Sequence, residues 1–224
     1  MKHYAIIVAG GSGNRMQTET PKQFLLLCGI PVLMHTIKIF AQSNFSPEII
    51  VVIHPEYHQL WKNLCNEFNF HIPHQITGGG KERFHSVKNA LDLIDGDGLV
   101  AVHDAVRCLT STELVDDCYQ YAQEFGNAIA AVKPTDSIRQ IAGASTKMVN
   151  RDDFYLIQTP QTFNLKLLKS AYSQDFSLVF TDDASVIEQQ GHAIRIVEGE
   201  KSNIKITYPI DLEFAELKLN KKAL

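Results

Sequence analysis

Short runs of apolar residues recur along this chain, and within each run they do not alternate with polar ones. The clearest runs are YAIIVA at 4–9, EIIVVI at 48–53, LVAVH at 99–103 and AIAAV at 128–132. A strand with one solvated face alternates apolar and polar side chains, whereas a strand buried on both faces does not. These runs therefore predict a sheet that is covered on both faces.

Helical patterns lie between the runs, so strands and helices are expected to follow one another in turn. We expect helices at 31–41, 56–68, 82–94, 165–172, 182–190 and 209–221, and further strands near 71–76 and at 193–197. This order is typical of an α/β fold with a mostly parallel, twisted sheet flanked by helices and joined by right-handed crossovers. Because no repeat or linker interrupts the 224 residues, we expect residues 1–224 to form one domain.

Residues 133–157 break this order. The stretch SIRQI at 137–141 alternates apolar and polar residues, and a Gly-Ala-Ser turn follows at 143–145. The pattern predicts an antiparallel hairpin with little core of its own. Such a β-arm would pack on something else, and we expect a second subunit. The alternative is a local excursion that folds back on its own domain.

Charge and cysteine usage exclude several classes of protein. Lys and Arg number 21 and Asp and Glu 25, for a net charge of -4, which does not favour a nucleic-acid or membrane-surface partner. The apolar core at 5–9 is too short for a signal peptide, and no run approaches the ~18 apolar residues of a membrane span. The four cysteines form no C-x-x-C pair, so free thiols and a cytoplasmic location are expected.

Polar clusters stand beside several predicted strands. They are GGSGNR at 10–15, GGGKER at 78–83, HDAVR at 103–107 and NIK at 203–205. In open parallel sheets, ligands bind at the carboxyl ends of the strands. We therefore expect these clusters to meet at one edge of the sheet and to form a binding site.

The first glycine cluster matches neither common nucleotide-binding motif. A dinucleotide fingerprint needs a third glycine where Met16 stands, and a P-loop needs Gly directly before its Lys, where Pro21 precedes Lys22. What remains is a loop whose backbone N–H groups can approach phosphates closely. Arg15 and Lys22 bracket it. They could be ordinary surface cations, but their position beside a glycine-rich strand end favours phosphate binding.

Seven motifs in register carry a resemblance to a known family. GGSGNRM at 10–16 and PKQF at 21–24 are followed by GGxxRxxSV at 79–87, HDAVR at 103–107, TPQxF at 159–163, TDDAS at 181–185 and NIKIT at 203–207. In this order they resemble the 2-C-methyl-D-erythritol 4-phosphate cytidylyltransferase family over about residues 4–215. The resemblance implies a sheet of the nucleotide-diphospho-sugar transferase type. It also implies a reaction in which CTP and methylerythritol phosphate give the CDP-alcohol and pyrophosphate, as a step of non-mevalonate isoprenoid synthesis.

That reaction fits the residue types present. The attacking group is the substrate's own phosphate, largely dianionic at pH 7, so no activated Ser, Cys or His is needed. Alignment and charge neutralisation remain to be supplied, and cations and backbone donors supply them. The chain offers both and has no G-x-S-x-G nucleophile motif.

The resemblance also assigns roles by position. Arg15 and Lys22 match residues that hold the triphosphate and stabilise the transition state, and Arg151 and Lys205 complete the catalytic set. Other positions match the CTP site: Ala9, Gly10, Gly11, Gly80, Lys81, Ser86 and Ala105. A third group matches the site of the alcohol phosphate: Asp104, Arg107, Arg151, Thr159, Thr181 and Lys205.

The metal and the partner subunit follow from the same resemblance. Mg²⁺ is expected to bind through the CTP phosphates, with no metal held mainly by side chains. Arg151 would lie on the β-arm and reach into the neighbouring subunit's site, which makes a homodimer with shared active sites part of the catalyst.

Three residues depart from the family pattern. Lys81 stands where Asp is frequent, Cys108 where Pro follows the Arg of the HDAxR motif, and Val106 where Ala is common. Two alternatives therefore stay open. The sister family of ribitol-5-phosphate cytidylyltransferases shares HDAVR and TPQxF. A non-catalytic CTP-binding module would explain the departures as decay, although the cationic positions are intact.

Other polar residues have plainer interpretations. His103 and Asp104 are adjacent on a strand and point to opposite faces, so His103 is expected to be structural. The pairs His54/His58 and His71/His74 lack a third ligand and are expected at the surface. The DGD at 95–97 precedes a strand and is typical of a turn, whereas Asp182 is placed to cap a helix.

Overall fold

The structure is a computed structural model that describes residues 1–10 and 20–222. Gly11 and Arg15, both predicted to contact CTP, lie outside the described residues. Within the described part of the chain, a seven-stranded sheet has the order β11-β7-β10-β6-β1-β4-β5. Its strands are β1 (Lys2–Ala9), β4 (Glu48–Ile53), β5 (Gln75–Gly78), β6 (Gly98–Asp104), β7 (Asn127–Val132), β10 (Leu156–Asn164) and β11 (Ile196–Glu198).

The sheet is mostly parallel, which confirms the predicted fold class. β1 pairs in parallel with β4 and β6, β4 with β5, and β11 with β7. β10 is antiparallel to both of its neighbours, β6 and β7. It therefore runs back through the middle of the sheet and delivers residues 158–161 to the same edge as the ends of β1 and β6.

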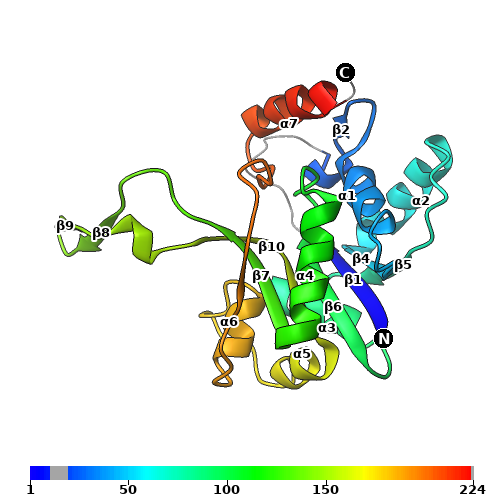
Figure 1. Ribbon diagram of the computed structural model, residues 1–224. Coiled ribbons are helices and arrows are strands. Elements are labelled where there is room, and N and C mark those ends of the chain that lie inside the picture. The colour runs from blue at the N-terminus through cyan, green and yellow to red at the C-terminus, as the bar shows by residue number, and fades with distance from the viewer. Residues whose placement is uncertain (11–19, 223–224) are drawn as a thin grey trace.

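Helices cover both faces of the sheet, as the unalternated strands predict (Figure 1). One face packs against α1 (Val32–Ala41), α2 (His58–Glu67) and α4 (Thr112–Phe125), and the other against α3 (Arg83–Leu91), α5 (Leu165–Ala171) and α6 (Asp183–Glu188). Alternate β1 residues divide between the two cores: Ile7 joins the first and Ile6 the second, each with no exposed surface. Both faces of the strand are thereby removed from water.

A third, smaller apolar cluster lies under the last helix, α7 (Pro209–Lys222). It contains Leu27, Val32, Ile206, Ala215 and the buried Cys108. The short strands β2 (Leu26–Leu27) and β3 (Ile30–Pro31) border it. This cluster holds the 203–207 segment against the HDAVR loop, because the Ile206 N–H donates to the carbonyl of Val106 at 3.0 Å.

Two of the longer elements, α4 and β10, were not among the predicted ones. α4 follows a Ser111 cap, buries Leu114 and Tyr119, and ends at Gly126 with φ of 86°. The spacing of its buried residues is that of an amphipathic helix and can be found in the sequence. β10 reads QTPQTFN over most of its length, and polar residues around a proline argue against a central strand. The strand is tolerated in the sheet because Gln158, Thr159 and Gln161 find hydrogen-bond partners inside the protein.

The fifth strand also differs from its prediction. β5 spans Gln75–Gly78 rather than 71–76. Pro73 lies in the segment that precedes it, and proline has no N–H to donate to a neighbouring strand. The pairing with β4 therefore begins only at Gln75.

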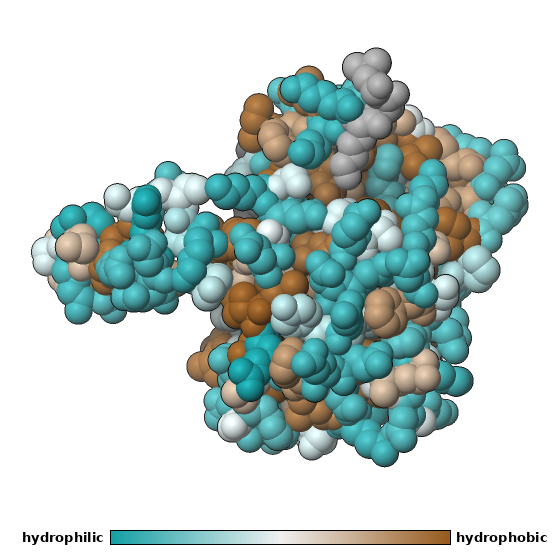
Figure 2. Space-filling view, viewed as in Figure 1, coloured by the Kyte–Doolittle hydropathy of each residue, from teal (hydrophilic) through white to brown (hydrophobic). Residues whose placement is uncertain are grey.

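The β-arm projects from the body of the molecule and carries β8 (Arg139–Ala142) paired with β9 (Ser145–Met148) (Figure 1). Ile141 on it is 81% exposed and Met148 74% exposed. In Figure 2 the arm stands clear of the remaining surface. Leu156 and Ile157, at the end of the predicted 133–157 segment, already belong to β10 and pair with β7.

Among the described residues, no helix has the length and apolar character needed to cross a membrane.

Candidate active site

The strand register brings the polar clusters to one edge of the sheet. Val8 pairs with Asp104, and Ala9 pairs with Ile53, which in turn pairs with Gly78. The loops after β1, β5 and β6 therefore begin side by side. This edge has two parts. One is lined by glycines and is called the nucleotide half after the ligand predicted for it, and the other is a cationic pocket beside it.

Close backbone approach defines the nucleotide half. A Cβ placed on Gly10 would lie 3.5 Å from the Ser86 Oγ and 4.0 Å from the Cα of Gly79. The Ser86 hydroxyl accepts from the Gly80 N–H at 3.0 Å and donates to the carbonyl of Glu82 at 3.2 Å. A Cβ on Gly80 would meet the His85 Cβ at 2.4 Å, so a side chain at position 80 would displace this loop.

The nucleotide half is bordered by three further residues, Ala9, Ala105 and Lys22. The Ala105 N–H donates to Val8 at 3.1 Å, and the Thr36 hydroxyl donates to the Ala105 carbonyl at 2.7 Å. Gln23 donates to the Ala9 carbonyl at 2.8 Å, which sets the short helix η2 (Lys22–Phe24) beside the end of β1. Lys81, one of the three departures from the family pattern, is exposed to solvent.

The cationic pocket has a volume of about 260 Å³. Its walls come from β6, β10, the start of α3, the turn before α6 and the 203–207 segment. The lining residues are Arg83, Asp104, Arg107, Ile157, Gln158, Thr159, Gln161, Thr181, Asp182 and Lys205. Five residues assigned to the alcohol phosphate are thus brought together, namely Asp104, Arg107, Thr159, Thr181 and Lys205.

Three cations surround the carboxylate of Asp104. Lys205 Nζ lies 3.0 Å and Arg107 Nε 3.4 Å from its Oδ2, while Arg83 Nε lies 3.6 Å from its Oδ1. Burial alone would raise the pKa of Asp104, but the positive charges of Arg83, Lys205 and Arg107 outweigh it and hold the pKa well below its usual range. Asp104 is therefore ionised at neutral pH and gathers the three cations on one wall of the pocket.

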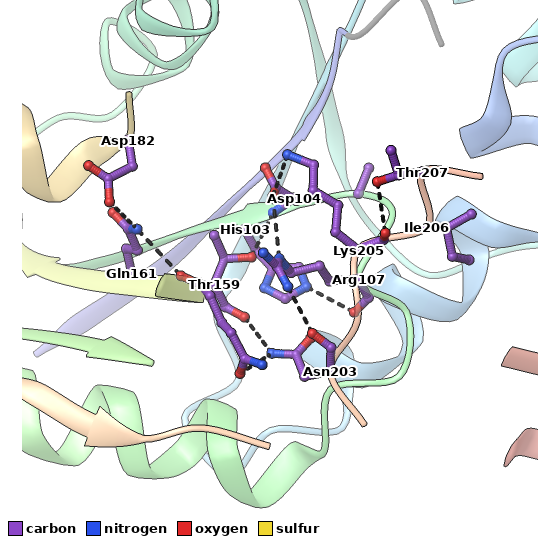
Figure 3. Close-up of polar contacts among 12 residues, drawn as sticks. His103, Asp104, Arg107, Thr159, Gln161, Asp182, Asn203, Lys205, Ile206 and Thr207 are labelled. Atoms are coloured by element: carbon purple, nitrogen blue, oxygen red, sulfur yellow. Dashed lines mark hydrogen bonds and ion pairs between the residues drawn. The ribbon is translucent and has the colours of Figure 1, made fainter. Parts of the chain in front are cut away.

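Hydrogen bonds hold this wall in place, as Figure 3 shows. Arg107 donates to the Asn203 carbonyl at 2.8 Å, and the Asn203 amide donates to the Thr159 carbonyl at 2.8 Å. The Asp104 N–H donates to the Thr159 hydroxyl at 3.1 Å. The HDAVR loop, β10 and the 203–207 segment are thereby joined. The departure at Cys108 leaves Arg107 anchored, because the thiol is buried in the apolar cluster under α7.

β10 loses its regular pairing with β7 between Ile157 and Gln161. Gln158 and Thr159 lie in this irregularity and line the pocket, as expected of the bulges that re-aim side chains next to functional sites. Gln161 contacts the turn before α6, with its amide donating to Asp182 at 3.0 Å. Asp182 also caps α6 by accepting from the Ser185 N–H at 2.9 Å, which confirms the predicted cap.

Sequence reasoning missed several members of the site, chiefly Arg83. Its guanidinium donates to both carboxylate oxygens of the buried Asp183, at 2.9 and 2.7 Å. Arg83, Gln161, Asp182 and Asn203 all stood inside the quoted motifs. The signal was therefore present, but only the folded chain shows which of them face the pocket.

Arg151 does not line the pocket of its own chain. It begins the short helix η4 (Arg151–Asp153) on the β-arm, is exposed, and donates to the Thr135 carbonyl at 2.5 Å. Its predicted role in a partner subunit's site therefore stays a prediction.

His103 is fully buried and has the structural role expected of it. Its Nε2 lies 3.2 Å from the Arg107 carbonyl, and burial lowers its pKa to about 4. Asp97, of the DGD turn, forms an exposed ion pair with Lys166 at 2.7 Å. His74 was expected at the surface but is only partly exposed, since it accepts a hydrogen bond from the Trp61 indole at 2.9 Å.

An open α/β sheet with glycine-lined strand ends beside a cationic pocket is the arrangement that a nucleotidyltransferase requires, because its chemistry rests on holding and neutralising phosphates. Comparison with known proteins points to the same class. Residues 3–221 match the family model described as 2-C-methyl-D-erythritol 4-phosphate cytidylyltransferase. The chain belongs to this family.

Curated relatives carry the same description. One from Bacteroides thetaiotaomicron is 45% identical over 213 residues, which cover 95% of this chain and 97% of the relative. One from Azobacteroides pseudotrichonymphae is 46% identical over 214 residues, covering 95% and 96%. Among solved structures, the 4-diphosphocytidyl-2C-methyl-D-erythritol synthase of Anaerococcus prevotii is 30% identical with a TM-score of 0.83, covering 98% of this chain and 96% of that one.

Proposed function

We propose that this protein joins the phosphate of 2-C-methyl-D-erythritol 4-phosphate to the cytidylyl group of CTP and releases pyrophosphate, as a step of non-mevalonate isoprenoid synthesis. The observation that carries the proposal is the cationic pocket beside the glycine-lined strand ends. Small-molecule sites typically start at about 300 Å³. A pocket of about 260 Å³ therefore suits a small phosphorylated alcohol and leaves the nucleotide to the neighbouring half.

The reaction needs no nucleophile from the protein. A phosphate oxygen of the alcohol phosphate attacks the α-phosphorus of CTP, a new P–O bond forms, and the bond between the α-phosphorus and the bridging oxygen breaks. The electron pair leaves with pyrophosphate. Since the attacking phosphate is already deprotonated at pH 7, the protein's task is to align two anions and neutralise their charge.

The site residues divide this task. Lys205 and Arg107 offer positive charge to the alcohol phosphate, and Thr159 and Thr181 offer hydroxyl groups. Ala9, Gly10 and Gly80 leave room for the nucleotide, while Ser86 fixes the loop at Gly80 by the hydrogen bond described above. Lys22, together with Arg15, which lies outside the described residues, would neutralise the triphosphate as the charge on the leaving pyrophosphate grows.

We propose that Mg²⁺ takes part and is carried by the triphosphate. Within residues 1–10 and 20–222, no three His, Cys, Asp or Glu side chains come together as metal ligands, and the Asp104 carboxylate already faces three cations. CTP oxygens would therefore supply the ligands. When bound, the metal would add positive charge to the reacting phosphates.

We further propose a homodimer in which Arg151 completes the partner's site. The β-arm supports this assembly, because Ile141 and Met148 leave its apolar side chains exposed. A cytoplasmic location is also proposed, since all four cysteines are free thiols and secreted proteins commonly pair theirs.

Pyrophosphate release tests the proposal. Purified protein is incubated with CTP, Mg²⁺ and methylerythritol phosphate, with ribitol 5-phosphate in a parallel reaction. Release with methylerythritol phosphate alone is expected. Release with ribitol phosphate alone would keep the chemistry and change the substrate, and CTP binding without release in either reaction would indicate a binding module.

A further inference from the structure

Two carboxylates, those of Asp183 and Asp104, contact the guanidinium of Arg83. Its two terminal nitrogens donate to both oxygens of Asp183, and its Nε lies 3.6 Å from the carboxylate of Asp104. Asp183 has no exposed surface. A paired, two-pronged contact of this kind fixes the orientation of the arginine plane as well as its position.

Asp183 is also held in place by Tyr172. The Tyr172 hydroxyl donates to its Oδ1 at 2.6 Å. The Tyr172 ring stacks on Phe84, the neighbour of Arg83, with ring centroids 4.6 Å apart. Tyr172 does not line the pocket, so its hydroxyl reaches the site only through Asp183 and Arg83.

Arg83 joins the two halves of the site. It is the first residue of α3, the helix that carries Ser86 and follows the glycine loop of the nucleotide half. Asp183 begins α6, directly after Thr181 and Asp182 on the wall of the pocket. Asp104, the other contact of Arg83, orients Lys205 and Arg107 through its Oδ2.

We propose that Arg83 is a positioning residue for the transfer reaction, which sets the alcohol-phosphate pocket relative to the bound nucleotide. This inference rests on the proposed function. In-line attack requires the two phosphates to be aligned, and a displacement of about 1 Å can cost on the order of 100-fold in rate. A lysine at position 83 would keep the charge but could not hold both Asp183 oxygens and face Asp104 at once.

The test compares Arg83→Lys with wild-type protein by two measurements. We expect kcat/KM for methylerythritol phosphate to fall about tenfold or more, while the dissociation constant for CTP alone stays within about twofold. Lys88→Met on the same helix, outside the pocket, is the matched control and should leave both values unchanged. Wild-type turnover within about twofold for a folded Arg83→Lys would overturn the inference, as would a parallel loss of CTP affinity.

Tyr172→Phe provides a second variant that removes no charge and keeps the stacked ring. We expect kcat/KM for methylerythritol phosphate to fall in this variant too, by a smaller factor than in Arg83→Lys, while the affinity for CTP is retained. An unchanged kcat/KM in both Tyr172→Phe and Arg83→Lys would leave Arg83 a purely structural residue and contradict the proposal.

Measurements on the wild-type protein distinguish a failure of the proposed function from a failure of the inference about Arg83. If it releases no pyrophosphate with any alcohol phosphate, the proposed function fails. The role of Arg83 is then measured without turnover, as the rise in melting temperature that methylerythritol phosphate produces in protein saturated with α,β-methylene-CTP. A smaller rise in Arg83→Lys than in wild type supports the positioning role, and an equal rise contradicts it.

Discussion

The ammonium of Lys22 donates a hydrogen bond to the carbonyl of Ile206 at 2.8 Å, across 184 positions of sequence. Ile206 follows Lys205, whose own ammonium faces Asp104. The contact thus links the edge of the nucleotide half to the cationic pocket. If CTP binds in the nucleotide half as proposed, a cation at this junction would neutralise the charge that develops on the leaving pyrophosphate.

Lys22→Ala is expected to lower kcat by about 100-fold or more, with a smaller change in the KM for CTP. The reason is that a fixed cation contributes most where charge develops in the transition state. Steady-state pyrophosphate release checks this, with Lys62→Ala on α2 as a control. An unchanged kcat with only a raised KM would contradict the transition-state role.

Gly80→Ala is expected to raise the KM for CTP by about tenfold, because the added methyl group would meet the His85 Cβ at 2.4 Å and displace the loop. Gly78→Ala is the matched control, since its Cβ would make an ordinary contact of 3.5 Å with Pro55. Equal effects of the two substitutions on CTP binding would show that the crowding at Gly80 does not matter.

Arg151→Ala and Lys22→Ala, each nearly inactive alone, should recover activity when mixed. If Arg151 serves the partner's site, half of the randomly exchanged dimers are mixed and each has one intact site, so about a quarter of all sites recover. Subunit exchange is verified by mass spectrometry of tagged chains. No recovery after complete exchange would place Arg151 in its own chain's chemistry or outside the reaction.

His103 should make the fold less stable in mild acid. Burial lowers its pKa to about 4 in the folded protein, whereas an unfolded histidine titrates near about 6.5. Between these values the unfolded chain binds the extra proton, so stability falls as pH falls, by up to about 1.4 kcal/mol per pH unit.

His103→Gln keeps a donor for the Arg107 carbonyl and should flatten this part of the curve. Chemical unfolding at pH 7, 6, 5 and 4 measures the difference, with the exposed His192→Gln as control. The same slope in His103→Gln and wild type would show that another group causes the acid sensitivity.

The sequence was sufficient where local patterns carry the information. Unalternated runs predicted the central strands because burial on both faces leaves no place for polar residues. The same reasoning failed at β10, where Thr159 and Gln161 are buried polar residues in mid-sheet. It fails there because hydrogen bonds inside the protein make such burial tolerable, and those partners lie far away in sequence.

By itself, the sequence determined the fold class, the family and the loops that carry the site. Motifs next to strand ends must meet at one edge of a parallel sheet. Only the tertiary structure decided how the residues of the candidate site are arranged. Three cations gather around Asp104, and Arg83 pairs with Asp183. Two of these contacts, Lys205 with Asp104 and Arg83 with Asp183, join residues about a hundred positions apart. Electrostatic interactions depend on distance and burial, and these arise only when the chain has folded.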